Sequence, residues 1–314
     1  MSVHYLDSIS RGWDRMISIL FKPFNISRWL VMGFAAFLAF LGEGSPSFRY
    51  TRSGEKFDAV DIKKFNYENV APVVKEWIAA HSGIFVLIMM GLILFTALVV
   101  IFLWLNSRGK FVFLDNVVKG EGRITEPWNA YAKEGNSLFR WRLVYGIVVL
   151  FIAGTYAFFF TLQIITILSQ DIAVFPNLLW SVAVSLAMIS VLAYIRFFIN
   201  HFIVVIMYVK RVSATAAWGI FLRILYQRFW AILVFSILML LLSIGFFIGI
   251  LLIGLLTCCI GYVLLLIPYV KNVFLLPVEV WFRSISLYFL GELDPAYRIL
   301  DPVLTTPESP ERTA

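Results

Sequence analysis

The segment from Trp230 to Val270 decides the fold. It reads WAILVFSILMLLLSIGFFIGILLIGLLTCCIGYVLLLIPYV, which is 41 residues without a charged side chain. A helix needs about 20 apolar residues to cross the hydrocarbon core of a bilayer, so this segment is long enough for two passes. A tight turn between the passes is offered by residues at and beyond its middle: Gly249, Gly254, Thr257 and Gly261. We therefore predict a transmembrane helical hairpin.

Four further apolar runs are candidate spans. Ile84–Leu105 supplies 22 uncharged residues, and Leu143–Leu168 supplies 26, with Gln163 as its one strongly polar side chain. Leu178–Val209 supplies 32 residues and is interrupted by three polar groups. Trp29–Leu41 is short and follows a mixed-charge segment, and Gly42-Glu43-Gly44 after it does not resemble a signal-peptide cleavage site, so we expect it to be retained. The prediction is an all-α polytopic bundle of about six transmembrane spans.

The composition agrees with a surface that faces lipid. Of the 314 residues, 61% are hydrophobic and 14% are charged, whereas soluble domains carry about 25% charged residues. The formal net charge is +7. The basic residues flank the apolar runs, and no stretch outside these runs is long enough to supply a solvated basic module. We therefore expect membrane lipids as partners and no nucleic acid.

The basic residues near the span ends predict the orientation, because they resist translocation. Lys and Arg outnumber Asp and Glu by four to two in 1–28, by seven to four in 106–142, and by four to none in 210–228. Segment 42–83 holds six residues of each sign. We predict a cytosolic N-terminus, a cytosolic C-terminus because the span count is even, and an outer loop at 42–83.

A repeated pattern of tryptophans organises the chain. Three of them open apolar runs, and each has another tryptophan 12 to 16 residues upstream. Tryptophan suits the headgroup level because its ring is apolar and its N–H is polar. Around Trp13, apolar residues recur at helical spacing opposite a charged face, which is typical of a helix in the interface plane. The predicted interfacial anchors are the upstream set Trp13, Trp128 and Trp218 and the span-opening set Trp29, Trp141 and Trp230.

The repeat predicts three hairpins within a single membrane domain over 1–314, each preceded by an interfacial amphipathic helix. Pro127 makes the middle elbow the least regular of the three. The predicted parts are an interfacial helix at 1–28, a first hairpin at 29–105 with its outer loop at 42–83, an elbow and second hairpin at 106–209, an elbow and third hairpin at 210–282, and an amphipathic segment with a disordered tail at 283–314.

Arg196, Asn200 and His201 form a cluster of strongly polar groups within a long apolar run. Ionisable groups at membrane depth are costly and often mark functional sites. The repeat, however, aligns this region with the point where the second span leaves the membrane, so Arg196 can instead snorkel to headgroups as an anchor. Glu279 and Asp115 complete the candidate polar membrane site, either as ion-pair partners of these groups or as solvated carboxylates at the interface.

Catalytic and metal-binding patterns are absent from the sequence. His4, His81 and His201 are far apart, and Cys258 and Cys259 are adjacent within an apolar run, without zinc-type spacing. No HExxH, GxSxG, Walker or dinucleotide motif occurs. We expect no enzymatic activity, no metal and no cofactor.

Three groups of apolar stretches carry a resemblance to known proteins: Ser107–Asp115, Phe202–Tyr208 with Ala217-Trp218, and Thr257–Gly261 continuing to Ile267–Val270, Leu276-Pro277 and Ser286–Leu290. They resemble a group of uncharacterised multi-pass prokaryotic membrane proteins, which is similar to the membrane domain fused to some bacterial glycerophosphodiester phosphodiesterases. Where others carry a proline before the methionine of the middle stretch, this chain has Val205-Ile206-Met207. The resemblance implies a cytoplasmic (inner) membrane location and no transferable active site.

Two functions agree with these features. The first is a non-enzymatic accessory or scaffold protein that binds lipid or a partner, either another protein or a second copy of the chain. The alternative is a small-solute transporter or channel with a path near Arg196, Asn200 and His201. A wet polar cavity at mid-bilayer favours transport, whereas a core filled with Phe and Leu favours the scaffold.

Overall fold

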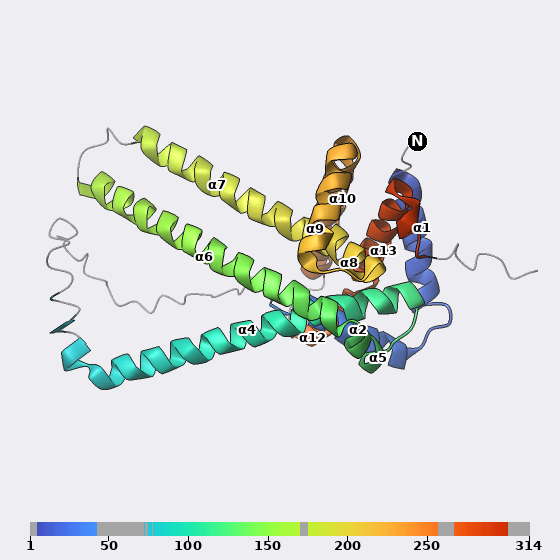
Figure 1. Ribbon diagram of the computed structural model, residues 1–314, viewed down its shortest axis with the longest axis horizontal. Coiled ribbons are helices and arrows are strands. Elements are labelled where there is room, and N and C mark those ends of the chain that lie inside the picture. The colour runs from blue at the N-terminus through green and yellow to red at the C-terminus, as the bar shows by residue number, and fades with distance from the viewer. Residues whose placement is uncertain are drawn as a thin grey trace, which may run out of the picture. The chain divides into compact units, whose positions relative to one another are not determined.

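The computed structural model describes residues 5–42, 72, 75–76, 78–169, 175–256 and 267–300, with the side chains of 162, 164–169 and 175–178 left aside. All regular elements within these residues are helical, apart from an isolated bridge between Phe21 and Phe24. The all-α class predicted from the sequence is thereby confirmed. The principal helices (Figure 1) are α1 (Tyr5–Leu20), α2 (Ile26–Phe40), α4 (Ser82–Lys119), α5 (Thr125–Ala130), α6 (Ala132–Ser169), α7 (Phe175–Phe198), η2 (Ile199–Ile203), α8 (Val204–Lys210), α9 (Ala214–Gln227), α10 (Phe229–Leu256), α12 (Pro268–Phe274) and α13 (Leu276–Leu293).

Four helical runs in the described residues are long and apolar enough to cross a bilayer. They are Ser82–Lys119, Ala132–Thr161, Leu179–Lys210 and Phe229–Leu256. A fifth crossing is possible if α12 and α13, which meet at a bend of 62°, act as one broken span. Helix α2 has 15 residues and is shorter than each of the four long runs. These helices are compatible with a multi-pass membrane protein, while the number six and the three hairpins stay predictions.

The contacts within the chain divide it into two compact units. Unit 1 comprises 1–41, 104–141 and 197–314, and unit 2 comprises 42–103 and 142–196. This division does not test the predicted hairpin boundaries. It does not test the predicted single domain either. The expected boundary at residue 283 falls inside α13. Parts of the predicted outer loop and of the last apolar run lie outside the described residues.

Unit 2 consists mainly of helical stretches whose large apolar side chains stand exposed. Phe151 and Trp180, for example, have 76% and 73% of their surface accessible. Apolar patches of this extent are typical of a surface that faces lipid. Polar groups in unit 2 bond to each other: the Tyr156 hydroxyl is 2.5 Å from the Ser181 carbonyl, and the Ser181 hydroxyl is 2.5 Å from Gln163 Oε1. Such interhelical bonds satisfy groups that hydrocarbon cannot solvate.

Unit 1 has a packed core in which α1 lies against α13 (Figure 1) and α2 against α12. This packing buries only part of the apolar face predicted for the first helix. Met16 and Leu20 are buried, whereas Leu6 and Trp13 stay exposed. An ideal Cβ placed on Gly12 would lie 2.9 Å from Ile285 Cγ1, so α1 approaches α13 closely. The helix therefore packs on protein as well as presenting apolar groups outward.

Helices α2 and α4 approach each other closely at Gly109. An ideal Cβ at this position would lie 2.6 Å from the carbonyl carbon of Leu38 and 2.8 Å from the backbone nitrogen of Ala39. Backbone atoms cannot move aside as a flexible side chain can, so a larger residue here forces the helices apart. Small residues at such crossings are the usual means of close helix packing in membranes.

We expect Gly109→Ala to lower the free energy of unfolding by about 1–3 kcal/mol, because it overpacks a backbone contact. Gly91→Ala in the same helix is the matched control, since a Cβ at Gly91 meets nothing within 4 Å. Denaturant titration of both variants in detergent micelles, followed by circular dichroism, measures the difference. Equal stability of the two variants would contradict the close approach.

Candidate functional site

Asn200 and His201 lie in a π-helical turn, η2, between α7 and α8. A π-turn inserts an extra residue into the helix and changes which backbone carbonyls are bonded within it, and such turns are frequent at functional sites. The Asn200 carbonyl accepts a hydrogen bond from Nη1 of Arg283 on α13. The π-turn thus links the end of the α7–α8 run to another helix of unit 1.

Lys110 of α4 donates to the Asn200 side chain, with 2.8 Å between Nζ and Oδ1. Only 1% of the surface of Lys110 is accessible, and its Nζ also lies 3.2 Å from the Ala39 carbonyl. Asn106, one turn earlier on α4, donates to the carbonyls of Ala39 at 2.6 Å and Leu41 at 3.0 Å. These bonds form a buried polar network that joins α4, the end of α2, η2 and α13.

His201 points into an aromatic environment. Its Nδ1 is 2.6 Å from the Ser286 hydroxyl, and its ring centroid is 4.4 Å from that of Phe197. Next to it, the rings of Phe235 and Phe289 stack at 3.9 Å. The predicted pair Asn200 and His201 is therefore part of a packed core of unit 1.

Asp115 belongs to a second cluster at the end of α4. It accepts from the Tyr208 hydroxyl at 2.9 Å and forms an ion pair with Lys119 at 3.0 Å. The Tyr208 ring stacks on Tyr131 at 4.7 Å, and the guanidinium of Arg211 lies 3.7 Å from the Tyr131 ring centroid. Burial raises the pKa of the Tyr131 hydroxyl above its ordinary value.

The predicted polar site is thus distributed over several places. Arg196 is exposed in the last turn of α7, and Glu279 is half-buried in the first turn of α13. Two residues that we did not predict, Lys110 and Arg283, are the ones that bond to Asn200. A signal for Lys110 exists in the sequence, because Asn106 and Lys110 are spaced i, i+4 and share a helix face.

A cavity of about 630 Å³ opens beside α6, between Trp104 and four residues of that helix: Lys133, Asn136, Phe139 and Arg140. Lys133, Asn136 and Arg140 follow each other at i, i+3 and i+7, so they share one helix face. Lys133 and Arg140 are exposed, and neither has a hydrogen bond or ion pair to another described residue. We call these five residues the α6 cavity.

The wall of the α6 cavity is fixed by a cation–aromatic stack. The Arg108 guanidinium lies 4.8 Å from the ring centroid of Trp104 and 5.1 Å from that of Trp128. Asn136 Oδ1 accepts hydrogen bonds from Trp104 Nε1 and Arg108 Nε, both at 3.1 Å. The cavity therefore combines rigid aromatic sides with two cations, Lys133 and Arg140, that bond to no other described residue.

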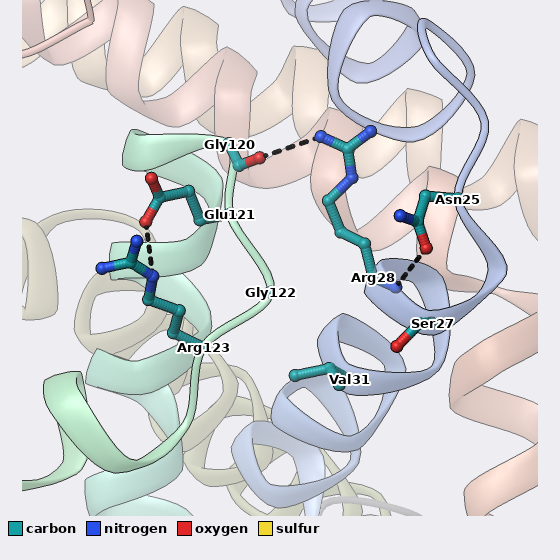
Figure 2. Close-up of a pocket in the computed structure, with 8 residues that line it drawn as sticks. All are labelled: Asn25, Ser27, Arg28, Val31, Gly120, Glu121, Gly122 and Arg123. Carbon is teal, nitrogen blue, oxygen red and sulfur yellow. Dashed lines mark hydrogen bonds and ion pairs between the residues drawn. The ribbon is translucent and has the colours of Figure 1, made fainter.

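A second cavity of about 330 Å³ lies between the start of α2 and the turn 120–123 (Figure 2). Arg28 donates to the carbonyls of Gly120 at 3.3 Å and Pro23 at 2.6 Å. Arg123 pairs with Glu121 at 3.0 Å and with Glu126 at 2.7 Å, and this pairing lowers the pKa of Glu126. Because these arginines already have partners, we interpret this cavity as a structural junction between two turns.

The six predicted anchors lie in varied surroundings. Trp230 is 74% accessible, while Trp29 donates from Nε1 to the Val273 carbonyl at 3.1 Å. The other four contact further tryptophans: Trp13 meets Trp281 at 5.3 Å, Trp128 meets Trp104 at 5.7 Å, and Trp141 stacks on Trp218 at 5.3 Å. Their depth in a bilayer stays a prediction.

The chain belongs to a family of unknown function, DUF7544, whose model matches residues 3–276. No curated protein and no solved structure matches the chain significantly. Membership of an uncharacterised family agrees with the resemblance drawn from the sequence. The match carries no link to glycerophosphodiester phosphodiesterases, so that part of the resemblance stays a prediction.

We expect Tyr208→Phe to cost about 1–3 kcal/mol of stability, because it removes a donor from the buried Asp115 carboxylate. Tyr226→Phe on α9 is the matched control, since Tyr226 is 90% accessible and makes no hydrogen bond to a described residue. Denaturant titration in micelles compares the two variants. A Tyr208→Phe protein as stable as the control would show that this hydrogen bond does not stabilise unit 1.

Proposed function

We propose that this chain is an integral membrane protein that binds phospholipid headgroups without transforming them, and that the α6 cavity is the binding site. The observation that carries the proposal is the pairing of two cations that bond to no described residue, Lys133 and Arg140, with the aromatic sides Trp104 and Phe139. Phosphate oxygens bind to cations, while the glycerol and ester region of a lipid suits an aromatic surface. The cavity offers both in one place.

The position of the cavity along α6 supports this proposal. Arg140, Trp141 and Arg142 come directly before the apolar run that begins at Leu143. Basic and aromatic residues at the end of a span lie at the headgroup level of a bilayer. A cavity at Arg140 therefore meets lipid phosphates rather than acyl chains or bulk water.

The positive charge of the basic side chains also supports binding of phospholipid headgroups. A basic side chain near an anionic membrane surface contributes about 1 kcal/mol of attraction to it. The orientation proposed from the basic flanks places 106–142 on the cytosolic side of a prokaryotic inner membrane. Anionic lipids are thus the partners that this charge distribution favours.

The alternative, a solute path near Arg196, Asn200 and His201, has less support. Asn200 bonds to Lys110 and Arg283, and His201 packs against Phe197. Side chains committed to each other in this way would need to separate before a solute could pass. A scaffold role with a protein partner or a second copy stays compatible with lipid binding.

We expect Lys133→Gln combined with Arg140→Gln to weaken binding of phosphatidylglycerol roughly tenfold or more, because each cation contributes about 1 kcal/mol. The matched control is Arg223→Gln combined with Arg228→Gln, which removes the same charge from exposed positions on and just after α9. Native mass spectrometry of the purified chain, titrated with lipid, measures the affinity. Equal weakening in both double variants would refute a site at the α6 cavity.

The proposed orientation is tested with single cysteines in a background in which Cys258 and Cys259 are replaced by Ala. Ser82 and Ala130 are both exposed, at the start of α4 and the end of α5. A membrane-impermeant maleimide added to intact spheroplasts should label Ser82→Cys, and should label Ala130→Cys only after lysis. The reverse pattern would invert the orientation.

A further inference from the structure

Resting on the proposed function, we infer that the α6 cavity selects a lipid with two phosphodiester groups joined by a glycerol bridge over lipids with one. The inference comes from the order of polar groups along the cavity face of α6. A cation, Lys133, is followed by an amide, Asn136, and then by a second cation, Arg140. A headgroup with two anions and a neutral polar bridge has the same order.

The separation of the two cations is set by the helix. Seven residues at 1.5 Å rise place the Cα atoms of Lys133 and Arg140 about 10 Å apart along the axis. The Cα–Cβ bonds of a helix all tilt towards its N-terminus, so parallel side chains keep this separation. The oxygens of one phosphodiester are too close together to contact both cations in that arrangement. Two linked phosphodiesters can reach both.

Asn136 occupies the middle of this row, three residues after Lys133 and four before Arg140. Its Oδ1 is held by Trp104 Nε1 and Arg108 Nε, which fixes the carboxamide. The amide nitrogen makes no hydrogen bond to a described residue. It can therefore donate to the hydroxyl or ester oxygens of a bridging glycerol.

The charges of such a ligand also match the site. Two singly charged phosphodiesters neutralise Lys133 and Arg140 together, whereas a lipid with one phosphodiester leaves one cation without an anion. Basic pockets beside transmembrane helices on the cytoplasmic side commonly bind headgroups with more than one phosphate. Arg108 already has partners, because its guanidinium lies against the rings of Trp104 and Trp128 and its Nε donates to Asn136 Oδ1.

The experiment compares cardiolipin with phosphatidylglycerol at equal phosphate concentration, using the full chain in detergent and native mass spectrometry. We expect cardiolipin to bind at least tenfold more tightly. Lys133→Gln and Arg140→Gln should each reduce this preference to less than about threefold, while Arg140→Lys, which keeps the charge, and Arg223→Gln, the control, should preserve it. Asn136→Leu should reduce the preference without abolishing binding of phosphatidylglycerol.

The outcomes separate the two proposals. Equal affinity for both lipids, or equal loss for both lipids in the single variants, overturns the two-phosphate inference and leaves headgroup binding in place. Binding of neither lipid overturns both. Inorganic phosphate is the third probe: displacement of cardiolipin by phosphate at matched concentration would identify a site for free phosphate and overturn the inference as well.

Discussion

A buried ammonium group has to be solvated by protein atoms when water is excluded, and in unit 1 that group is Lys110. Its Nζ reaches the Asn200 side chain and the Ala39 carbonyl. The first of these partners sits in the π-turn, and the second is at the end of α2. The cost of leaving such a charge unsolvated is several kcal/mol, so Lys110, together with Asn106, constrains the end of α2 and η2 relative to α4.

The same requirement explains why the two units differ. The helical stretches of unit 2 present apolar side chains outward and bond their few polar groups to each other. Unit 1 instead collects buried polar residues on α4 and α13, among them Asp115, Asn116 and Ser284. Polar groups in both units bond to protein atoms, in unit 1 through a network that joins several helices and in unit 2 through smaller groups such as the one that links Tyr156, Ser181 and Gln163. The α6 cavity lies in unit 1, where cations are common.

The sequence predicted the helical class and four of the long apolar helices, because uncharged runs of this length have few alternatives. It placed Asn200 and His201 among the residues of interest, since polar groups in an apolar run are conspicuous. It did not identify Lys110 or Arg283. Both lie near the ends of apolar runs, where charged residues are expected whether or not they have a special role. Nor did it identify the α6 cavity, because Trp104 and Asn136 come together only through the crossing of α4 and α6 within unit 1. Pairings between distant segments depend on packing, which a local pattern does not encode.

The π-turn at Ile199–Ile203 has a further consequence for α8. Each residue of an α-helix advances the chain by about 100° around its axis, so one surplus residue rotates everything that follows by that angle. With the surplus residue in place, Tyr208 faces Asp115. Removing one residue from the turn would restore uniform winding and swing the Tyr208 hydroxyl to another side of the helix, with the amino acids of α8 unchanged. The rotation of α8 about its own axis, and not its amino-acid composition, therefore determines which side of the helix faces the Asp115 carboxylate.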